Sequence, residues 1–120
     1  EEAINNCDEI YNLYKKANIK VIRIGLQPTD NIAEGKDVIA GPFHPAFREL
    51  VESKSLNEKI YSIFSKNKGD IVIRINNRRI SKLYAGKKMF FNELKDKVNS
   101  NSLNVIFSWK TCLSVYFSIW

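Results

Sequence analysis

Asp70-Ile-Val-Ile-Arg-Ile-Asn76 is the stretch that decides the fold of the second half of the chain. Its three isoleucines alternate with a valine and an arginine, so they would share one face of an extended segment. This period of two is typical of a β-strand with one buried face. The stretch therefore predicts a strand at residues 70–76 that packs its isoleucines against a core.

Two helices and two further strands are predicted after this strand. The apolar residues of 80–84 indicate a short helix, and those of 91–98 have the spacing of a second one. The run Ala85-Gly-Lys-Lys-Met89 separates the two helices. Residues 103–107 are apolar except for Asn104, and residues 113–119 alternate apolar with polar side chains, which predicts two strands. The second half is thus predicted to be a β-α-α-β-β unit.

The first half predicts a helix, a strand and another helix. Apolar residues recur at helical spacing over residues 3–17, with a stop at Asn18. Residues 20–26 form a short, mostly apolar run that is typical of a buried parallel strand. His44-Pro45 would open the second helix, because proline is tolerated at the first helical position. These elements together would form one step of a wound sheet or barrel.

A domain boundary is predicted near residue 55. Ser53-Lys-Ser55 breaks the apolar pattern, and Ser55-Leu-Asn-Glu58 has the form of a capping box that starts a new helix. We therefore expect an α-β-α piece at 1–54 and a small α+β module at 55–120. The fold class expected for the whole chain is α/β (α+β).

Composition excludes several classes of function. Of the 120 residues, 44% are hydrophobic, but no apolar run reaches the length of about 18 residues that spans a bilayer. No membrane partner is therefore expected. No signal peptide opens the chain either, so a cytoplasmic protein is predicted. The chain begins without Met in a helical pattern, which indicates a fragment boundary, although N-terminal processing would give the same picture.

Catalytic and metal-binding signals are absent from the sequence. There is one His, and the two cysteines, Cys7 and Cys112, are far apart, which predicts free thiols rather than a metal site. No nucleotide-binding glycine loop, serine-hydrolase elbow or zinc-protease helix occurs. We expect no catalytic residue, no metal ligand and no cofactor held by these residues alone.

Positive charge is concentrated in the second half. Residues 1–60 carry eight Lys/Arg and ten Asp/Glu, whereas residues 61–120 carry eleven Lys/Arg and three Asp/Glu. Such a basic segment favours a polyanionic partner, most often nucleic acid. A solvated lysine-rich surface is the alternative interpretation.

The loop at residues 27–43 is long for a structureless connection, which marks it as a functional candidate. It follows the predicted strand, and the carboxyl end of such strands carries the ligand site in α/β folds. Gly25 would allow a ligand to approach the backbone, and Gln27 offers a paired donor and acceptor. The alternative is a strand exit in which Gln27 bonds to nearby backbone.

Two stretches of the first half resemble a known family. Val21-Ile-Arg-Ile-Gly-Leu-Gln-Pro-Thr29 and Val38-Ile-Ala-Gly-Pro-Phe-His-Pro-Ala-Phe-Arg-Glu-Leu-Val-Glu52 are similar to the end of the barrel in radical SAM iron–sulfur oxidoreductases, bacterial proteins related to the Elongator catalytic subunit. The resemblance covers roughly residues 3–54. It implies a parent protein that binds a 4Fe-4S cluster and S-adenosylmethionine, and it places Gly25, Leu26 and Gln27 where such barrels contact that cofactor. The family's Cys-x-x-x-Cys-x-x-Cys motif is absent here.

The second half resembles the core of a KH domain, in which a G-x-x-G loop between two helices clamps a nucleic-acid backbone. Gly86, Lys87 and Lys88 match the loop, whereas Met89 replaces its second glycine. Further cations at Arg78, Arg79 and Lys82 would pair with phosphates. The alternative is a degenerate KH-like unit kept for packing.

These observations lead to two hypotheses of different class. In the preferred one, the chain is the C-terminal portion of a radical SAM enzyme and recognises a substrate, plausibly tRNA, for the rest of the barrel. In the other, it is a structural module that docks on the rest of the barrel or self-associates through an exposed edge, without binding nucleic acid. The sequence does not indicate activity from these residues alone.

Overall fold

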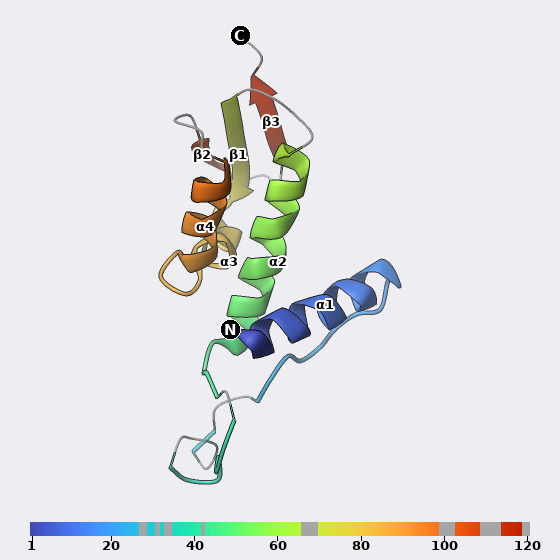
Figure 1. Cartoon of the computed structure of the whole chain (residues 1–120), viewed down its shortest axis with the longest axis vertical. Coiled ribbons are helices and arrows are strands. Elements are labelled where there is room, and N and C mark those ends of the chain that lie inside the picture. Colours follow the sequence, from blue (N-terminus) through green and yellow to red (C-terminus); the bar gives the residue numbers. More distant parts are fainter. Residues whose placement is uncertain are drawn as a thin grey trace.

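The computed structural model describes residues 1–26, 29–30, 32, 35–41, 43–65, 70–98, 103–108 and 114–118 of the chain; residues 70, 71, 107, 108 and 114–118 are described by their backbone alone. Helices and strands follow one another in a mixed α+β order (Figure 1). They are α1 (Glu2–Lys16), α2 (Phe47–Phe64), β1 (Asp70–Asn76), the 3-10 turn η1 (Asn77–Arg79), α3 (Ile80–Tyr84), α4 (Met89–Val98), β2 (Leu103–Ser108) and β3 (Ser114–Ser118).

The predicted β-α-α-β-β order of the second half is confirmed. The three strands form one sheet in the order β2-β1-β3, in which β1 pairs with β2 in parallel and with β3 in antiparallel orientation. Ile73 of β1 is paired with Val105 of β2, so the inward faces of the two strands coincide. Ile73 and Ile75 are fully buried and Arg74 is exposed, as the alternating pattern predicts.

Two helices cover one face of this sheet. In Figure 1, α2 and α4 lie side by side in front of the strands, and α3 sits at the lower end of α4. Their apolar residues meet the inward isoleucines in a single cluster, whose buried members are Ile60, Ile73, Ile75, Leu83, Phe91, Leu94 and Val98. The second half therefore has a core of its own, to which α2 contributes one side.

A second, smaller core forms where α1 crosses the lower end of α2 (Figure 1). Its buried members are Ile4 of α1, Leu50 and Val51 of α2, and Phe90 of α4. Because α2 contributes to both clusters, it joins the two halves of the chain.

The predicted first helix is confirmed, and its end has an identifiable cause. Asn18 adopts the left-handed conformation at φ 56°, and its N–H donates to the carbonyl of Lys15. The N–H of Ile19 donates to the carbonyl of Tyr14 at 2.8 Å. These two bonds form a Schellman motif, in which asparagine takes the position usually filled by glycine.

The strand predicted at residues 20–26 is wrong. These residues form no regular strand, and the Ile22 side chain is 80% exposed. A strand requires a neighbour for its ladder of hydrogen bonds, and β1, β2 and β3 form a sheet without this segment. The segment instead runs beside α1 and α2, with Ile24 packed against the second core.

The helix break predicted at residues 53–55 is also wrong, since α2 runs unbroken from Phe47 to Phe64. Ser55 does not cap a helix: its hydroxyl donates to Asn12 Oδ1 of α1 at 2.9 Å. Glu58 pairs with Lys54 on the same helix instead of bonding back to Ser55. The boundary predicted between residues 54 and 55 therefore lies inside α2.

The interface between α1 and α2 contains a buried carboxylate. Asp8 is 3% exposed, and its Oδ1 atom finds no hydrogen-bond partner among the described residues. Burial, and secondarily the neighbouring Glu58, raises the pKa of Asp8 to about 6. The charged form of this side chain therefore opposes folding at neutral pH.

Replacing Asp8 by asparagine should stabilise the chain at neutral pH. The folded pKa of Asp8 lies above its unfolded value, so wild-type stability falls as the pH rises from about 4 to 6. We expect Asp8→Asn to raise the free energy of unfolding at pH 7 by about 2 kcal/mol, and to have little effect at pH 4. Urea denaturation at both pH values measures this. Glu9→Gln, on the exposed side of α1, is the control, and an equal gain in that variant would contradict the interpretation.

Replacing Gly86 by alanine should destabilise the second core. Gly86 has φ +61°, and a Cβ there would lie 2.7 Å from Leu50 Cδ2. We expect Gly86→Ala to lower the free energy of unfolding by about 2 kcal/mol, since it adds backbone strain and overpacks a buried leucine. Gly35 also has positive φ, but no atom lies within 4 Å of the point that a Cβ would occupy there, so Gly35→Ala isolates the backbone contribution. Chemical denaturation measures the free energy of unfolding of both variants. Equal losses in the two variants would contradict the packing argument.

Candidate functional site

The turn between α3 and α4 has an unusual backbone. Gly86, Lys87 and Lys88 are all left-handed, with φ values of 61°, 54° and 66°. The N–H of Lys88 donates to the carbonyl of Tyr84, and the N–H of Met89 donates to that of Gly86, each at 3.1 Å. Lysine in this conformation costs about 1–2 kcal/mol per residue relative to the right-handed form. The fold therefore holds two lysines in a disfavoured conformation at this turn.

The side chains of the turn are exposed and basic. Lys87 and Lys88 both face solvent, and Lys88 Nζ lies 4.9 Å from the centroid of the Tyr84 ring. The Tyr84 ring in turn meets Phe91 edge to face at 4.9 Å, and burial raises the pKa of its hydroxyl. The two lysines directly precede α4, whose N-terminus carries a partial positive charge. Their positive charges and that of the helix end therefore add, which attracts an anion to the turn.

Gly86 is explained by packing rather than by an open approach to a ligand. The position that a Cβ would take is occupied by the Leu50 side chain of α2. The next position of the loop pattern, Met89, is 39% exposed and starts α4. The glycine therefore allows the turn to lie close against α2, and the lysines remain as the groups that reach outward.

The remaining predicted cations lie elsewhere. Arg78 is exposed, and its backbone N–H donates to Asn76 Oδ1 at 2.8 Å. Arg79 and Lys82 line a pocket of about 340 Å³ that also involves α1 and α2, and to which no residue of the turn contributes. Of the six predicted nucleic-acid-binding residues, three therefore lie in the turn and two in the pocket, while Arg78 belongs to neither.

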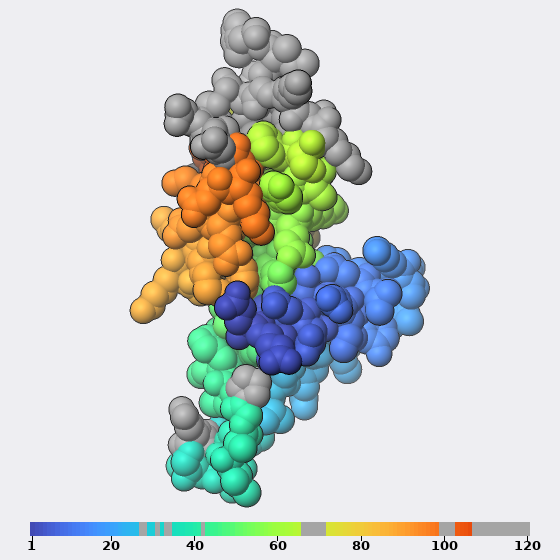
Figure 2. All heavy atoms as spheres, in the orientation of Figure 1, coloured from blue at the N-terminus to red at the C-terminus, as the bar shows by residue number. Residues whose placement is uncertain are grey.

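Helix α1, which supplies part of the pocket lining, crosses the front of the molecule below α4 and most of α2 (Figure 2).

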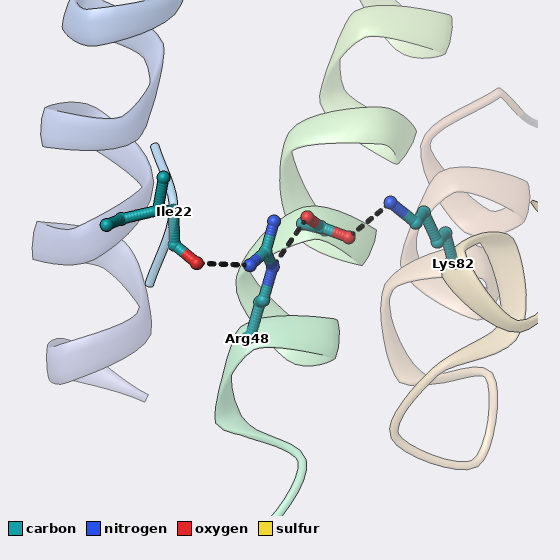
Figure 3. Close-up of polar contacts among 4 residues, drawn as sticks. Ile22, Arg48 and Lys82 are labelled. Carbon is teal, nitrogen blue, oxygen red and sulfur yellow. Dashed lines mark hydrogen bonds and ion pairs between the residues drawn. The ribbon is translucent and has the colours of Figure 1, made fainter. Parts of the chain in front are cut away.

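Lys82 belongs to a chain of polar contacts that links distant segments (Figure 3). Glu52 Oε2 accepts from Lys82 Nζ at 2.6 Å, and Oε1 accepts from Arg48 Nε at 3.0 Å. Arg48 also donates from Nη1 to the carbonyl of Ile22 at 2.9 Å. The network holds α3 and the segment at residues 20–26 against α2.

Glu52 is the centre of this network and is only 8% exposed. Burial acts to raise the pKa of Glu52, but the hydrogen bonds from Lys82 and Arg48 outweigh it, so that the pKa lies below its ordinary value. The carboxylate is therefore charged at neutral pH and balances two cations. Sequence analysis missed it, although the i, i+4 spacing of Arg48 and Glu52 was a local signal for half of the network.

Two of the three residues predicted to contact a cofactor line an open, mostly apolar pocket of about 290 Å³. Gly25 and Leu26 meet Phe47 there, together with the half-buried thiol of Cys7. Gly25 has φ +73°, and a Cβ would lie 2.8 Å from Phe47 Cδ1, so glycine is required for packing as well. Gln27 lies outside the described residues.

The part of the chain that the structure describes contains no group of three or more His, Cys, Asp or Glu side chains that could hold a metal ion. His44 has a structural role: its Nδ1 accepts the N–H of Ala46, and α2 begins at Phe47, two residues after the start predicted at Pro45. Within the same described residues, no helix is both long enough and apolar enough to cross a lipid bilayer.

No protein-family model, curated protein or solved structure matches this chain. The radical SAM and KH-like resemblances therefore stay predictions.

Replacing Glu52 by glutamine should weaken the fold in a pH-dependent way. The folded pKa of Glu52 is lowered, so the stability it contributes is present at neutral pH and is lost as the pH falls below about 4. We expect Glu52→Gln to lower the free energy of unfolding at pH 7 by about 1 kcal/mol, because its two partners are partly exposed. Urea denaturation at pH 7 and pH 3.5 should show this loss disappearing in acid. Glu93→Gln, at an exposed position of α4, is the control, and a loss independent of pH would contradict the assignment.

Proposed function

We propose that this chain recognises RNA through the turn between α3 and α4, as the C-terminal, substrate-binding portion of a radical SAM iron–sulfur oxidoreductase. The observation that carries the proposal is the pair Lys87 and Lys88. Both are exposed, both have left-handed backbone, and both directly precede α4. Strained backbone of this kind is found mainly at functional sites.

The chemistry of the turn suits a phosphodiester backbone. Lysine ammonium groups and the first N–H groups of a helix are common partners of phosphate oxygens. Arg78 adds an exposed guanidinium at η1, the turn that precedes α3. None of these groups reads a base edge, so the proposed contact supplies affinity and position rather than sequence specificity.

The radical chemistry is assigned to the rest of the proposed parent protein. Two cysteines cannot supply the three thiolates of the family's cluster motif, so a cluster would be bound by other residues of the proposed parent protein. Gly25, Leu26 and Gln27 would contribute at most one wall of an S-adenosylmethionine site. The apolar pocket beside Gly25 and Leu26 supports that assignment, since the rest of the barrel would have to close its open side.

A different observation favours docking as a second candidate function. Several large apolar side chains of α1 and of the segment after it face solvent: Ile10, Leu13, Tyr14, Ile19, Ile22 and Leu26 are between 45% and 80% exposed. Ile10, Leu13 and Tyr14 share one face of α1 by their i, i+3, i+4 spacing. An apolar face of this kind supports packing against the rest of the proposed barrel or against a second copy.

The salt dependence of RNA binding tests the proposal. We expect the 120-residue chain to bind a single-stranded RNA in low salt and to lose affinity steeply as salt rises. Lys87→Ala/Lys88→Ala should reduce the slope of log K against log salt by about 1.4, because two phosphate contacts are removed. Fluorescence anisotropy with a labelled oligonucleotide measures both quantities.

Lys16→Ala/Lys20→Ala provides a matched control, since it removes the same charge from exposed positions outside the turn. An equal effect of the two double variants would mean that the turn contributes to RNA binding only through its net charge. Absence of RNA binding at low salt would contradict the proposal and leave docking as the function. Sedimentation of the chain at increasing concentration would then detect self-association.

A further inference from the structure

The pocket that contains Arg79 and Lys82 brings together cations from four elements. Lys15 comes from α1, Lys59 from α2, Arg79 from η1 and Lys82 from α3. One carboxylate, that of Glu52, lies among them, so the lining carries a net charge of +3. These residues are far apart in sequence, and the packing of α1 and of α3 against α2 brings them together (Figure 1).

The lysines of this pocket repel one another. Burial, and secondarily the charge of Lys59, lowers the pKa of Lys15, and Lys82 acts in the same direction. Asp8 and Glu52 act in the opposite direction, and the net result, with burial as the largest cause, is a lowered pKa. Lys15 Nζ also lies 4.7 Å from the centroid of the Tyr11 ring, which holds the ammonium at the pocket wall. An anion placed among these groups would relieve the repulsion.

Apart from Ser55, the remainder of the lining is apolar or aromatic. Tyr11 of α1, Leu56 of α2 and Ile75 of β1 contribute to the same pocket, and Ile75 is fully buried. A cavity of about 340 Å³ lies within the size range of small-molecule sites. Cations on one part of the lining and apolar groups on another fit a ligand with an anionic end and a planar or apolar body.

From this arrangement we propose that the pocket between α1, α2, η1 and α3 binds a phosphomonoester, with its phosphate among Lys15, Lys59, Arg79 and Lys82 and its body against Tyr11 and Leu56. A monoester carries about two negative charges and three acceptor oxygens, which matches the net charge of the lining better than a single carboxylate does. The site is separate from the proposed RNA contact, because Lys15 and Lys59 have no part in that contact.

Two sources could supply this chemistry, a free nucleotide and the phosphorylated end of an RNA strand. The probes are therefore adenosine monophosphate, adenosine, and one short RNA prepared with and without a 5′-phosphate. Isothermal titration calorimetry with the 120-residue chain should give a dissociation constant for the monophosphate at least about tenfold lower than for adenosine. The two RNA preparations differ in affinity only if the strand end enters the pocket.

Lys15→Gln/Lys59→Gln is the decisive variant. It should weaken binding of the monophosphate by at least about tenfold, since two charge-assisted contacts are lost. The variant is expected to fold, because it relieves repulsion. Circular dichroism and thermal denaturation check this, and single Lys59→Gln provides a milder substitution if the double variant unfolds.

The turn variant Lys87→Ala/Lys88→Ala separates this proposal from the proposed function. It should keep full affinity for the monophosphate while losing RNA affinity. Unchanged binding of the monophosphate by Lys15→Gln/Lys59→Gln, or equal affinity of the wild-type chain for the monophosphate and for adenosine, would overturn the pocket proposal and leave the RNA proposal untouched. Absence of RNA binding by the wild-type chain, with binding of the monophosphate intact, would overturn the RNA proposal and leave the pocket proposal untouched.

Discussion

The rest of the structure depends on the burial of α2 along most of its length. Val51 near its start and Ile60 in its later half are both fully buried, and they belong to different cores. A continuous helix therefore fixes the distance between α1 and the sheet. The polar residues between them follow from this constraint: Ser53, Ser55 and Asn57 are buried because α1 and α3 pack against that stretch of α2. Their hydrogen bonds go to Leu83 of α3 and Asn12 of α1, so polar groups that would otherwise be unsatisfied connect the neighbouring elements.

This use of polar residues explains where sequence reasoning failed. Ser53 and Ser55 carry the signature of a helix end, because serine competes for local backbone bonds. In α2 the hydroxyls instead have tertiary partners, the carbonyl of Leu83 and the side chain of Asn12, which no local pattern indicates. The strand at 70–76 was predictable because its period of two is local and the sheet supplies its neighbours. Residues 20–26 have similar propensities but no strand beside them among the described elements, and propensity without pairing does not make a strand.

The candidate sites likewise contain features that are local in sequence and features that depend on tertiary packing. Lys87 and Lys88 could be predicted because the sequence places them together between two recognisable helices. The left-handed backbone of both lysines could not, since no local pattern indicates positive φ at a residue other than glycine. Sequence reasoning missed Glu52, Lys15 and Lys59 as site residues. Taken one at a time, the sequences of α1 and α2 have the pattern of amphipathic surface helices, whose charged residues are expected to face solvent. Only the crossing of these helices turns their lysines toward the cations of the second half.

The distribution of charge acquires a different meaning once the helices are in place. The sequence divides into an acidic first half and a basic second half, which favours assigning all anion binding to the second half. In the fold, Lys15 and Lys59 of the first half stand beside Arg79 and Lys82, whereas Glu52 of the first half neutralises part of Lys82. Glu52 therefore has two effects: it ties α3 to α2, and it keeps Lys82 from acting as a free cation. A ligand phosphate in this pocket would compete with the Glu52 carboxylate chiefly for Lys82, which donates to it directly. For this reason the lysines contributed by the acidic half, rather than those of the basic segment, decide whether an anion is held there.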